Sequence, residues 1–415
     1  MSSTALEATS NRRYHDLYPE LGTGPISIEP YVSHEYFEKE RTLIFRKVWL
    51  NVGRVQDIPN AGDYFVKDLT ICNTSILIVR GKDGAIRAFH NMCSHRGNKL
   101  VAKIKGTCKG LFVCNFHSWA YAPDGSLRHI TDEANFFDVD KAALGLTPVS
   151  VDTWKGFIFI NVDQEPAETL TEYLGEFGTT FGEYPFSELA ATQFFWQTEI
   201  KANWKVIKDA FQEVWHIPYL HQRTVFYTPG ERYGAAMRFQ LYPRHGKLYG
   251  SRDRSSSTGG KSKRPLTPVE SFAVRYGSGA IHLDRSTEAT SQGVTRDGEP
   301  RATLGGCSIF PNCMMYTNDR TYLTHTFWPL AEDRTLWEVK YYYPKAHTLA
   351  ERFAQEYHKV ILRDINLEDG STLERTQTML GSGAKQHLIL QDQELLIRFH
   401  HKVADTFLNP ENSDR

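Results

Sequence analysis

The chain has 415 residues, of which 40% are hydrophobic and 13% aromatic, enough to fill the cores of two to three domains of about 150 residues each. Its formal charge is −1, so it offers no broad basic field for nucleic acid or an anionic membrane. We expect no membrane helix, because no run approaches ~18 apolar residues, and no secretory signal at the N-terminus. Six cysteines are few for this length and indicate reduced thiols in a cytoplasmic protein.

The first two predicted segments span residues 1–45 and 46–163. Residues 1–45 begin polar and become helical over 33–45, where Ser33 is a candidate N-cap. The segment 46–163 is rich in β-strand patterns, and it ends on the apolar strand 157–162. Two turn signals within it, Asp83-Gly84 and Asp124-Gly125, predict antiparallel hairpins.

The third predicted segment, residues 164–415, begins with an acidic, helix-rich link. A strand at 193–200 follows, and residues 236–345 alternate in strand fashion. Helical patterns return at 348–364 and 385–407. A stretch rich in Ser, Gly and charge at 251–265 has little to bury; we expect a surface loop there, with a lid or docking element as the alternative.

Two short clusters in the β-rich segment each supply one cysteine and one histidine. Cys93 and His95 form the first cluster and Cys114 and His117 the second, with residues 96–113 between them. In a [2Fe–2S] cluster of the Rieske type, one iron takes two cysteines and the other takes two histidines. Two loops that each give one thiolate and one imidazole fit that arrangement. A zinc finger is the alternative, although its half-sites usually pair like with like.

A second group of metal-ligand residues lies about a hundred residues further on. Asp209, Glu213 and His216 are spaced i, i+4, i+7, which predicts that they share one helix face. Pro218 bars a regular continuation of that helix, so His221 can swing back toward His216. Two histidines and a carboxylate form the facial triad of non-heme Fe(II) oxygenases. Surface or capping histidines are the alternative.

Residues 93–97 (CSHRG) and 114–121 (CNFHSWAY) resemble the Rieske signature of the large (α) subunits of ring-hydroxylating oxygenases. The resemblance implies an α+β fold. A small antiparallel β Rieske domain would be joined to a catalytic domain whose antiparallel sheet wraps on long helices, a helix-grip or START-like arrangement. Residues 367–377 resemble the family's C-terminal acidic pattern, which implies Asp369 as the third iron ligand. Composition alone does not choose it from its neighbours Asp364, Glu368 and Glu374.

The resemblance also implies roles for two further carboxylates. Glu213 would link the Rieske histidine of one subunit to an iron-ligating histidine of its neighbour. Most relatives have aspartate there, and the glutamate widens the expected substrates beyond a bare aromatic ring. Asp209, where many relatives have asparagine, is a candidate to support the ligands. The alternative for each is a solvated carboxylate on a helix surface.

The implied function is that of a terminal oxygenase. It would use O₂, and electrons from NAD(P)H delivered by a ferredoxin or flavin reductase, to hydroxylate an aromatic or other cyclic organic substrate. A homotrimer is implied, with or without small β subunits. Two alternatives stay open: an oxidative N- or O-demethylase acting on an alkyl or ammonium-type substrate, and a non-catalytic Rieske electron carrier. The residues between the two clusters predict a basic docking surface for an acidic ferredoxin, or else an ordinary solvated loop; the lysines concerned are Lys99, Lys103, Lys105 and Lys109.

Overall fold

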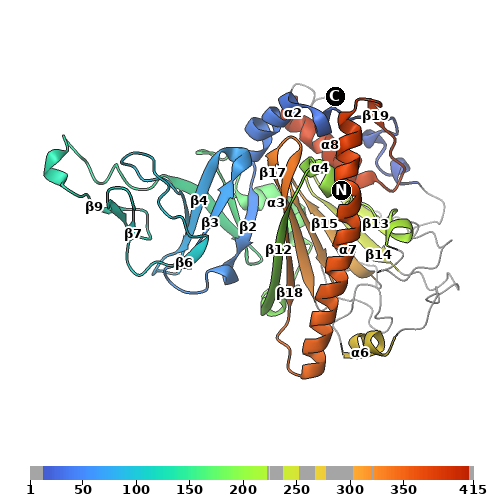
Figure 1. The fold of residues 1–415 in the computed structure, drawn as a ribbon. Coiled ribbons are helices and arrows are strands. Elements are labelled where there is room, and N and C mark those ends of the chain that lie inside the picture. The colour runs from blue at the N-terminus through green and yellow to red at the C-terminus, as the bar shows by residue number, and fades with distance from the viewer. Residues whose placement is uncertain are drawn as a thin grey trace. The chain divides into compact units, whose positions relative to one another are not determined.

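The computed structural model describes residues 13–221, 224, 237–251, 267–276, 302–318 and 321–410. These residues form two compact units, each taken by itself below (Figure 1). The small unit comprises residues 38–178, and the large unit comprises 13–37 together with 179–410. The small unit is therefore an insertion within the large one. The predicted boundaries at 45/46 and 163/164 stay predictions, and the predicted loop at 251–265 lies, after Ser251, outside the described residues.

The small unit is built on an antiparallel seven-stranded sheet in the order β2-β11-β10-β5-β4-β3-β6, and on a three-stranded sheet in the order β7-β8-β9. Both predicted hairpins are present: Gly84 and Gly125 take φ values of +81° and +87° at the turns, which glycine adopts without strain. The strands are β2 (Leu50–Arg54), β3 (Asp63–Leu69), β4 (Thr74–Arg80), β5 (Ile86–His90), β6 (Lys105–Thr107), β7 (Phe112–Val113), β8 (Ala120–Tyr121), β9 (Leu127–His129), β10 (Pro148–Trp154) and β11 (Phe157–Asn161).

The large unit contains a second antiparallel sheet, in the order β12-β18-β17-β16-β15-β14-β13. The long helix α7 (Leu349–Gly381) lies along it and packs on β12 (Figure 1). Thr348 starts that helix with a capping box to Glu351. The strands are β12 (Thr192–Ile200), β13 (Met237–Leu241), β14 (Gly246–Ser251), β15 (Ala302–Ile309), β16 (Cys313–Thr317), β17 (Tyr322–Ala331) and β18 (Arg334–Tyr343).

Short helices and one small sheet complete the two units. Ser33 accepts a hydrogen bond from the backbone N–H of Tyr36 at 3.1 Å, so the predicted N-cap is confirmed. The small sheet pairs β1 (Ile26–Ser27) with β19 (His387–Leu388). The remaining α-helices of the described residues are α1 (Glu29–Val32), α2 (His34–Lys39), which continues as a π-helical segment (Glu40–Phe45), α3 (Leu170–Thr179), α4 (Trp204–Asp209), α5 (Ile217–Leu220), α6 (Pro268–Tyr276) and α8 (Leu395–Leu408).

One face of the large sheet is covered by helices α4 and α7. Side chains alternate between the faces of a strand, and the strand register places Tyr316, His325 and Trp337 on the same face. Tyr316 donates its hydroxyl to the carbonyl of Phe211, which follows α4. Two strands away on the same face, in the same row as Tyr316, Tyr341 accepts a hydrogen bond at its hydroxyl from Asn366 of α7. The sheet and the two helices therefore enclose one buried layer.

Three helix predictions were wrong in their extent. The helix predicted to carry Asp209, Glu213 and His216 together ends at Asp209, and α5 begins only after His216. Tertiary contacts replace the missing helical hydrogen bonds, since Tyr316 binds the carbonyl of Phe211. The helix predicted at 348–364 continues unbroken to Gly381, whereas the one predicted at 385–407 begins at Leu395.

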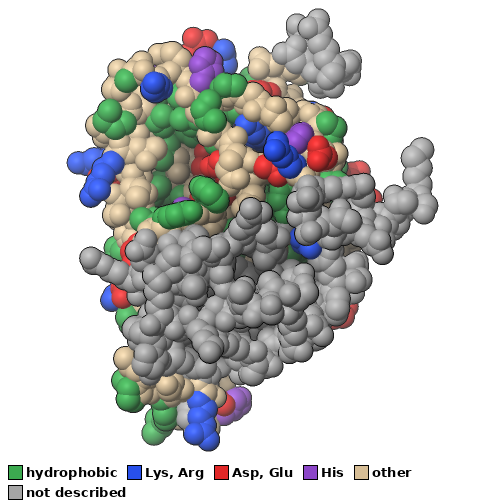
Figure 2. Space-filling view, turned by 90° about the vertical axis from the view of Figure 1, so that its right-hand side faces the viewer, with side chains coloured by type: hydrophobic (Ala, Val, Ile, Leu, Met, Phe, Trp, Pro, Cys, Tyr) green, Lys and Arg blue, Asp and Glu red, His purple; other side chains and the backbone are tan. Residues whose placement is uncertain are grey.

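The described surface carries charges of both signs. Lys and Arg side chains lie among Asp and Glu side chains on the face drawn in Figure 2, in keeping with a formal charge of −1 for the whole chain. In the described part of the chain, no helix has both the length and the apolar character needed to cross a membrane.

Candidate functional sites

The two cysteine loops of the small unit have equivalent backbones. In the first loop, the carbonyl of Cys93 accepts a hydrogen bond from the backbone N–H of Gly97. The backbone N–H of Cys93 donates to the carbonyl of Asn98. Cys114 repeats both contacts in the second loop. Each loop closes on a residue with positive φ, Gly97 (+72°) or Ser118 (+58°). The sequence therefore folds into two matching turns that each present one cysteine and one histidine.

Both cysteines are held by neighbouring polar groups. The Tyr121 hydroxyl lies 3.3 Å from the sulfur of Cys93 and accepts from the backbone N–H of Ser94. Asn98 donates to the sulfur of Cys114 at 3.6 Å. Burial disfavours the Cys114 thiolate, but backbone N–H groups and the Asn98 amide outweigh that effect and lower the pKa of this thiol. A thiolate, the form that binds iron, is favoured at Cys114.

The donor set of the two loops fits a Rieske cluster. The rings of His95 and His117 lie side by side, with centroids 4.5 Å apart. His95 also stacks on Trp119, and its Nδ1 is buried without a hydrogen-bond partner among the described residues. Cys93 and Cys114 are 2% and 1% exposed. Two buried sulfurs and two adjacent imidazoles, one of them with an unpaired nitrogen, match the ligands that a [2Fe–2S] cluster of this type requires.

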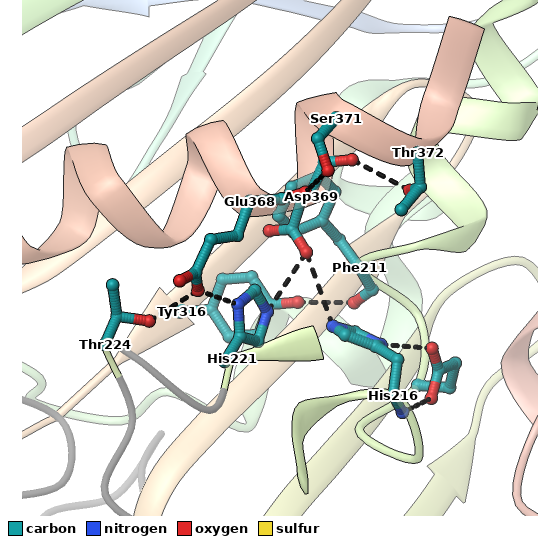
Figure 3. Close-up of polar contacts among 10 residues, drawn as sticks. Phe211, His216, His221, Thr224, Tyr316, Glu368, Asp369, Ser371 and Thr372 are labelled. Atoms are coloured by element: carbon teal, nitrogen blue, oxygen red, sulfur yellow. Dashed lines mark hydrogen bonds and ion pairs between the residues drawn. The ribbon is translucent and has the colours of Figure 1, made fainter. Parts of the chain in front are cut away.

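Three residues of the large unit converge on a second point (Figure 3). His216 precedes α5, His221 follows it, and Asp369 lies in the middle of α7. One carboxylate oxygen of Asp369 lies 3.1 Å from Nε2 of His221 and 3.5 Å from Nε2 of His216. One ligand atom from each of the three lies within 4.8 Å of the others. The structure thus brings together the two histidines and the carboxylate predicted from the sequence.

The electrostatics of this site favour a cation. Burial alone would lower the pKa of His216, but the carboxylates of Asp369 and Glu213 outweigh it and raise that pKa to about 10. Asp369 is 2% exposed, and its Oδ1 makes no hydrogen bond of good geometry within the described residues. An oxygen buried in this way costs free energy unless a cation or a donor pairs with it. Two imidazoles and one carboxylate are the ligand set of non-heme Fe(II).

Each histidine has its other ring nitrogen held by a glutamate. Glu213 contacts Nδ1 of His216 and also accepts from the His216 backbone N–H at 3.1 Å. Glu368 lies 2.8 Å from Nδ1 of His221, and Thr224 donates to the same Glu368 oxygen at 2.6 Å. Carboxylates in this position orient a histidine and leave Nε2 for the metal.

Asp209 lies apart from this group. Its carboxylate accepts from the Tyr31 hydroxyl at 2.6 Å and from the Gln212 amide at 3.0 Å. The Tyr31 hydroxyl also lies 2.7 Å from Nε2 of His401. Burial raises the pKa of Asp209 to about 7. Its contacts thus tie α4 to the N-terminal segment and to α8, and any support for the metal ligands is indirect.

Sequence reasoning missed several residues that hold the candidate ligands. Glu368 appeared only as a competing ligand, and its position beside Asp369 in the chain was the available signal. Asp364 instead pairs with Arg363, and Glu374 accepts from the backbone of Lys201. Tyr121 and Asn98 lie in or beside the quoted signature, but contacts to sulfur depend on how the loops fold.

The family comparisons agree with both sites. A family model described as the ring hydroxylating alpha subunit (catalytic domain) matches residues 190–409. A second, described as the Rieske [2Fe-2S] domain, matches residues 48–150. The first range contains both histidines and Asp369, and the second contains both cysteine loops.

Individual relatives act on different classes of compound. The oxygenase subunit of carnitine monooxygenase from Acinetobacter pittii is 34% identical over 188 residues, which are 45% of this chain and 49% of that protein. The alpha subunit of 2-aminobenzenesulfonate 2,3-dioxygenase from Alcaligenes sp. is 31% identical over 221 residues, 51% of this chain and 54% of that protein. The chain thus spans about half the length of the curated relatives it matches.

The fold is similar to that of solved oxygenase structures. Naphthalene 1,2-dioxygenase from Rhodococcus sp., bound to indole, superposes with a TM-score of 0.73 at 20% sequence identity. The superposition covers 96% of this chain and 97% of that chain. The predicted fold class, a β-rich Rieske domain followed by an α+β catalytic domain, is confirmed.

Proposed function

Because the chain belongs to the family of ring-hydroxylating α subunits, we propose that it is the terminal oxygenase of a multicomponent Rieske system. It would use O₂, and electrons from NAD(P)H passed on by a reductase, to hydroxylate an aromatic or other cyclic organic substrate. The convergence of His216, His221 and Asp369 carries this proposal, since a pure Rieske electron carrier has no use for a second metal centre.

The residues of this chain would divide the work between two metal sites. Cys93, His95, Cys114 and His117 would hold the [2Fe–2S] cluster, and His216, His221 and Asp369 would hold Fe(II). When bound, the cluster supplies single electrons and the mononuclear iron supplies O₂ chemistry. Glu213 and Glu368 keep the Nε2 atoms of the two histidines directed at one point.

Glu213 would have a second task. Its contact with His216 forms one half of the predicted link between a Rieske histidine and an iron-ligating histidine of the neighbouring subunit. Such a link requires an oligomer, so a homotrimer is part of the proposal, with or without β subunits. A ferredoxin or flavin reductase would supply the electrons. No disulfide joins any of the six cysteines, which fits the reducing cytoplasm.

A second candidate function is oxidative N- or O-demethylation or a related monooxygenation of an alkyl or ammonium-type substrate. Two observations favour it. Glutamate at position 213 departs from the aspartate common in the family, and the carnitine monooxygenase subunit is among the relatives. The two candidates differ in product, because demethylation releases formaldehyde and ring dihydroxylation does not.

Metal analysis followed by product analysis tests the proposal. A [2Fe–2S] cluster plus one mononuclear iron give about three irons and about two acid-labile sulfides per chain, whereas an electron carrier gives about two of each. His221→Ala should lose the third iron and keep both sulfides. The intact protein is then supplied with ferredoxin, reductase, ¹⁸O₂ and a panel of aromatic acids and N-methyl or O-methyl compounds. An iron-to-sulfide ratio near one in the intact protein would refute the oxygenase.

A further inference from the structure

His325 has a fixed proton position. It lies on β17 with 3% of its surface exposed, and its Nδ1 accepts a hydrogen bond at 3.1 Å from the indole N–H of Trp337 on β18. An indole N–H can only donate, so Nδ1 carries no proton. Burial lowers the pKa of His325 to about 3, although the Asp369 carboxylate opposes that shift. The ring is therefore neutral near pH 7, and its single proton is on Nε2.

That Nε2–H has no acceptor in the described part of the chain, where Trp337 is the hydrogen-bond partner of His325. The ring is surrounded by aromatic groups instead. Phe211 packs against it in a tilted arrangement with ring centroids 4.4 Å apart, and Tyr316 meets it edge-on with centroids 5.9 Å apart. The ring as a whole is 3% exposed, but Nε2 is not among the atoms that the surrounding residues seal off completely. A donor that keeps some accessible surface and has no acceptor among the described residues can be reached by a ligand that supplies the acceptor.

The same neighbours connect His325 with the candidate iron site. Phe211 precedes His216 by five residues, and Tyr316, which donates to the carbonyl of Phe211, lies behind His221 in Figure 3. The Asp369 carboxylate acts on the pKa values of both Tyr316 and His325. His325 therefore lies on the sheet wall of the layer that contains the metal ligands.

We propose that His325 orients the substrate of the proposed oxygenase, on whose function this inference rests, by donating a hydrogen bond from Nε2 to a carboxylate oxygen of an organic acid. The two candidate substrate classes differ in the group that is oxidised. Members of either class can carry the acid group that His325 would bind. Trp337 is a positioning residue, because its indole fixes which nitrogen of His325 donates.

Paired probes and two replacements at position 325 test this role. Benzoate is compared with toluene, and glycine betaine with tetramethylammonium, so that each pair differs in the acid group. His325→Asn keeps an acceptor near the position of Nδ1 for Trp337 but removes the donor at Nε2. His325→Gln reaches the position of Nε2 and keeps a donor there. Dissociation constants are measured by calorimetry on the iron-loaded protein, and thermal melting checks that each variant is folded.

The wild type is expected to bind at least one acid more tightly than its partner probe. Loss of a hydrogen bond to a charged group should reduce that preference about 10- to 100-fold in His325→Asn, and His325→Gln should keep most of it. A wild type without preference in either pair, or a His325→Asn variant with full preference, overturns the inference.

Trp337→Phe provides the test if replacements at position 325 do not fold. This variant keeps His325 but removes the indole N–H that holds the proton on Nε2. The preference for the acid over its partner probe should therefore fall severalfold, and an unchanged preference counts against the inference. Binding is measured without turnover. A protein that binds acids through His325 and forms no product would therefore refute the proposed function, and only the carboxylate-binding role of His325 would stand.

Discussion

His216 and His221 each contact a glutamate, but we expect the two glutamates to differ in role. Glu213→Gln should keep most of the mononuclear iron and a normal Rieske spectrum at saturating iron, yet lose nearly all product formation. A neutral amide cannot hold two histidines by charge-assisted hydrogen bonds. Glu213→Asp keeps the charge with a shorter reach, so we expect partial activity. Single-turnover oxidation of the reduced cluster, measured with iron content, checks both variants.

Glu368→Gln is the matched control for that experiment. Glu368 supports His221 as Glu213 supports His216, but it has no predicted part in electron transfer. Its replacement should weaken iron binding about 10- to 100-fold and leave electron transfer normal once iron is restored. If both variants show the same iron content and the same rate of cluster oxidation, Glu213 only orients His216 and has no part in electron transfer. Wild-type turnover in Glu213→Gln would exclude the link altogether.

At the scale of single residues, the sequence was informative where spacing carries chemistry. The paired cysteines and histidines and the His-x₄-His pair stand close together in the chain, so local patterns located them. Asp369 was chosen by resemblance, because the spacing of acidic residues does not distinguish it from Glu368. The structure separates the two by depth, since Asp369 is buried between the histidines and Glu368 reaches only the far side of one ring.

Gln377 joins α7, the helix that carries Asp369, to α4 and to the N-terminal segment. Its amide accepts from the backbone N–H of Asn203, at the start of α4, and donates to the backbone carbonyl of Tyr31. Gln377→Met should leave both backbone groups buried and unpaired, at a cost of about 2–4 kcal/mol in the free energy of unfolding. Chemical denaturation monitored by tryptophan fluorescence measures the change.

Thr378→Ala is the neighbouring control on the same helix. Thr378 is exposed and bonds only to its own helix, at Glu374, so its replacement should change stability by less than about 0.5 kcal/mol. Similar losses in both variants would mean that α7 is held by its general packing, with no special contribution from Gln377.

Strands were predicted better than helices, for a physical reason. An apolar run and a glycine turn encode β4 and β5 locally, and an alternating pattern encodes β17 and β18. The helix before His216 was predicted too long because Asp209, Glu213 and His216 do have helical spacing. In the structure the carbonyl of Phe211 accepts a hydrogen bond from the Tyr316 hydroxyl on the sheet, instead of a helical one. Such a contact from a strand a hundred residues away leaves no periodic signal in the segment itself.

At the scale of the whole molecule, we predict that ferredoxin docks on the lysines between the cysteine loops. Lys99 pairs with Asp68 at 2.7 Å, so it is a weaker docking candidate than sequence alone suggested, whereas Lys103, Lys105 and Lys109 are exposed. Lys103→Glu with Lys105→Glu should slow reduction of the cluster by an acidic ferredoxin roughly tenfold at low salt, since opposite charges speed encounter. Stopped-flow reduction over a range of ionic strength measures this.

Lys82→Glu is the control for charge alone. Lys82 is exposed in the turn between β4 and β5, at the opposite end of β5 from the Cys93 loop. Its replacement should leave the reduction rate nearly unchanged. Rates that respond neither to salt nor to the double lysine variant would place ferredoxin docking elsewhere.

The insertion of the small unit within the large one has a consequence for biosynthesis. Residues 13–37 leave the ribosome before the small unit does, yet Tyr31 contacts Asp209 and His401, which are 178 and 370 residues further along the chain. All of the small unit is translated before the first of these partners, and domains generally fold as units in the order of their synthesis. The nascent N-terminal segment therefore lacks these two partners of Tyr31 while the cluster-binding unit is synthesised and folds. A ribosome that stalls after residue 178 would release a unit with both cysteine loops and no catalytic partner.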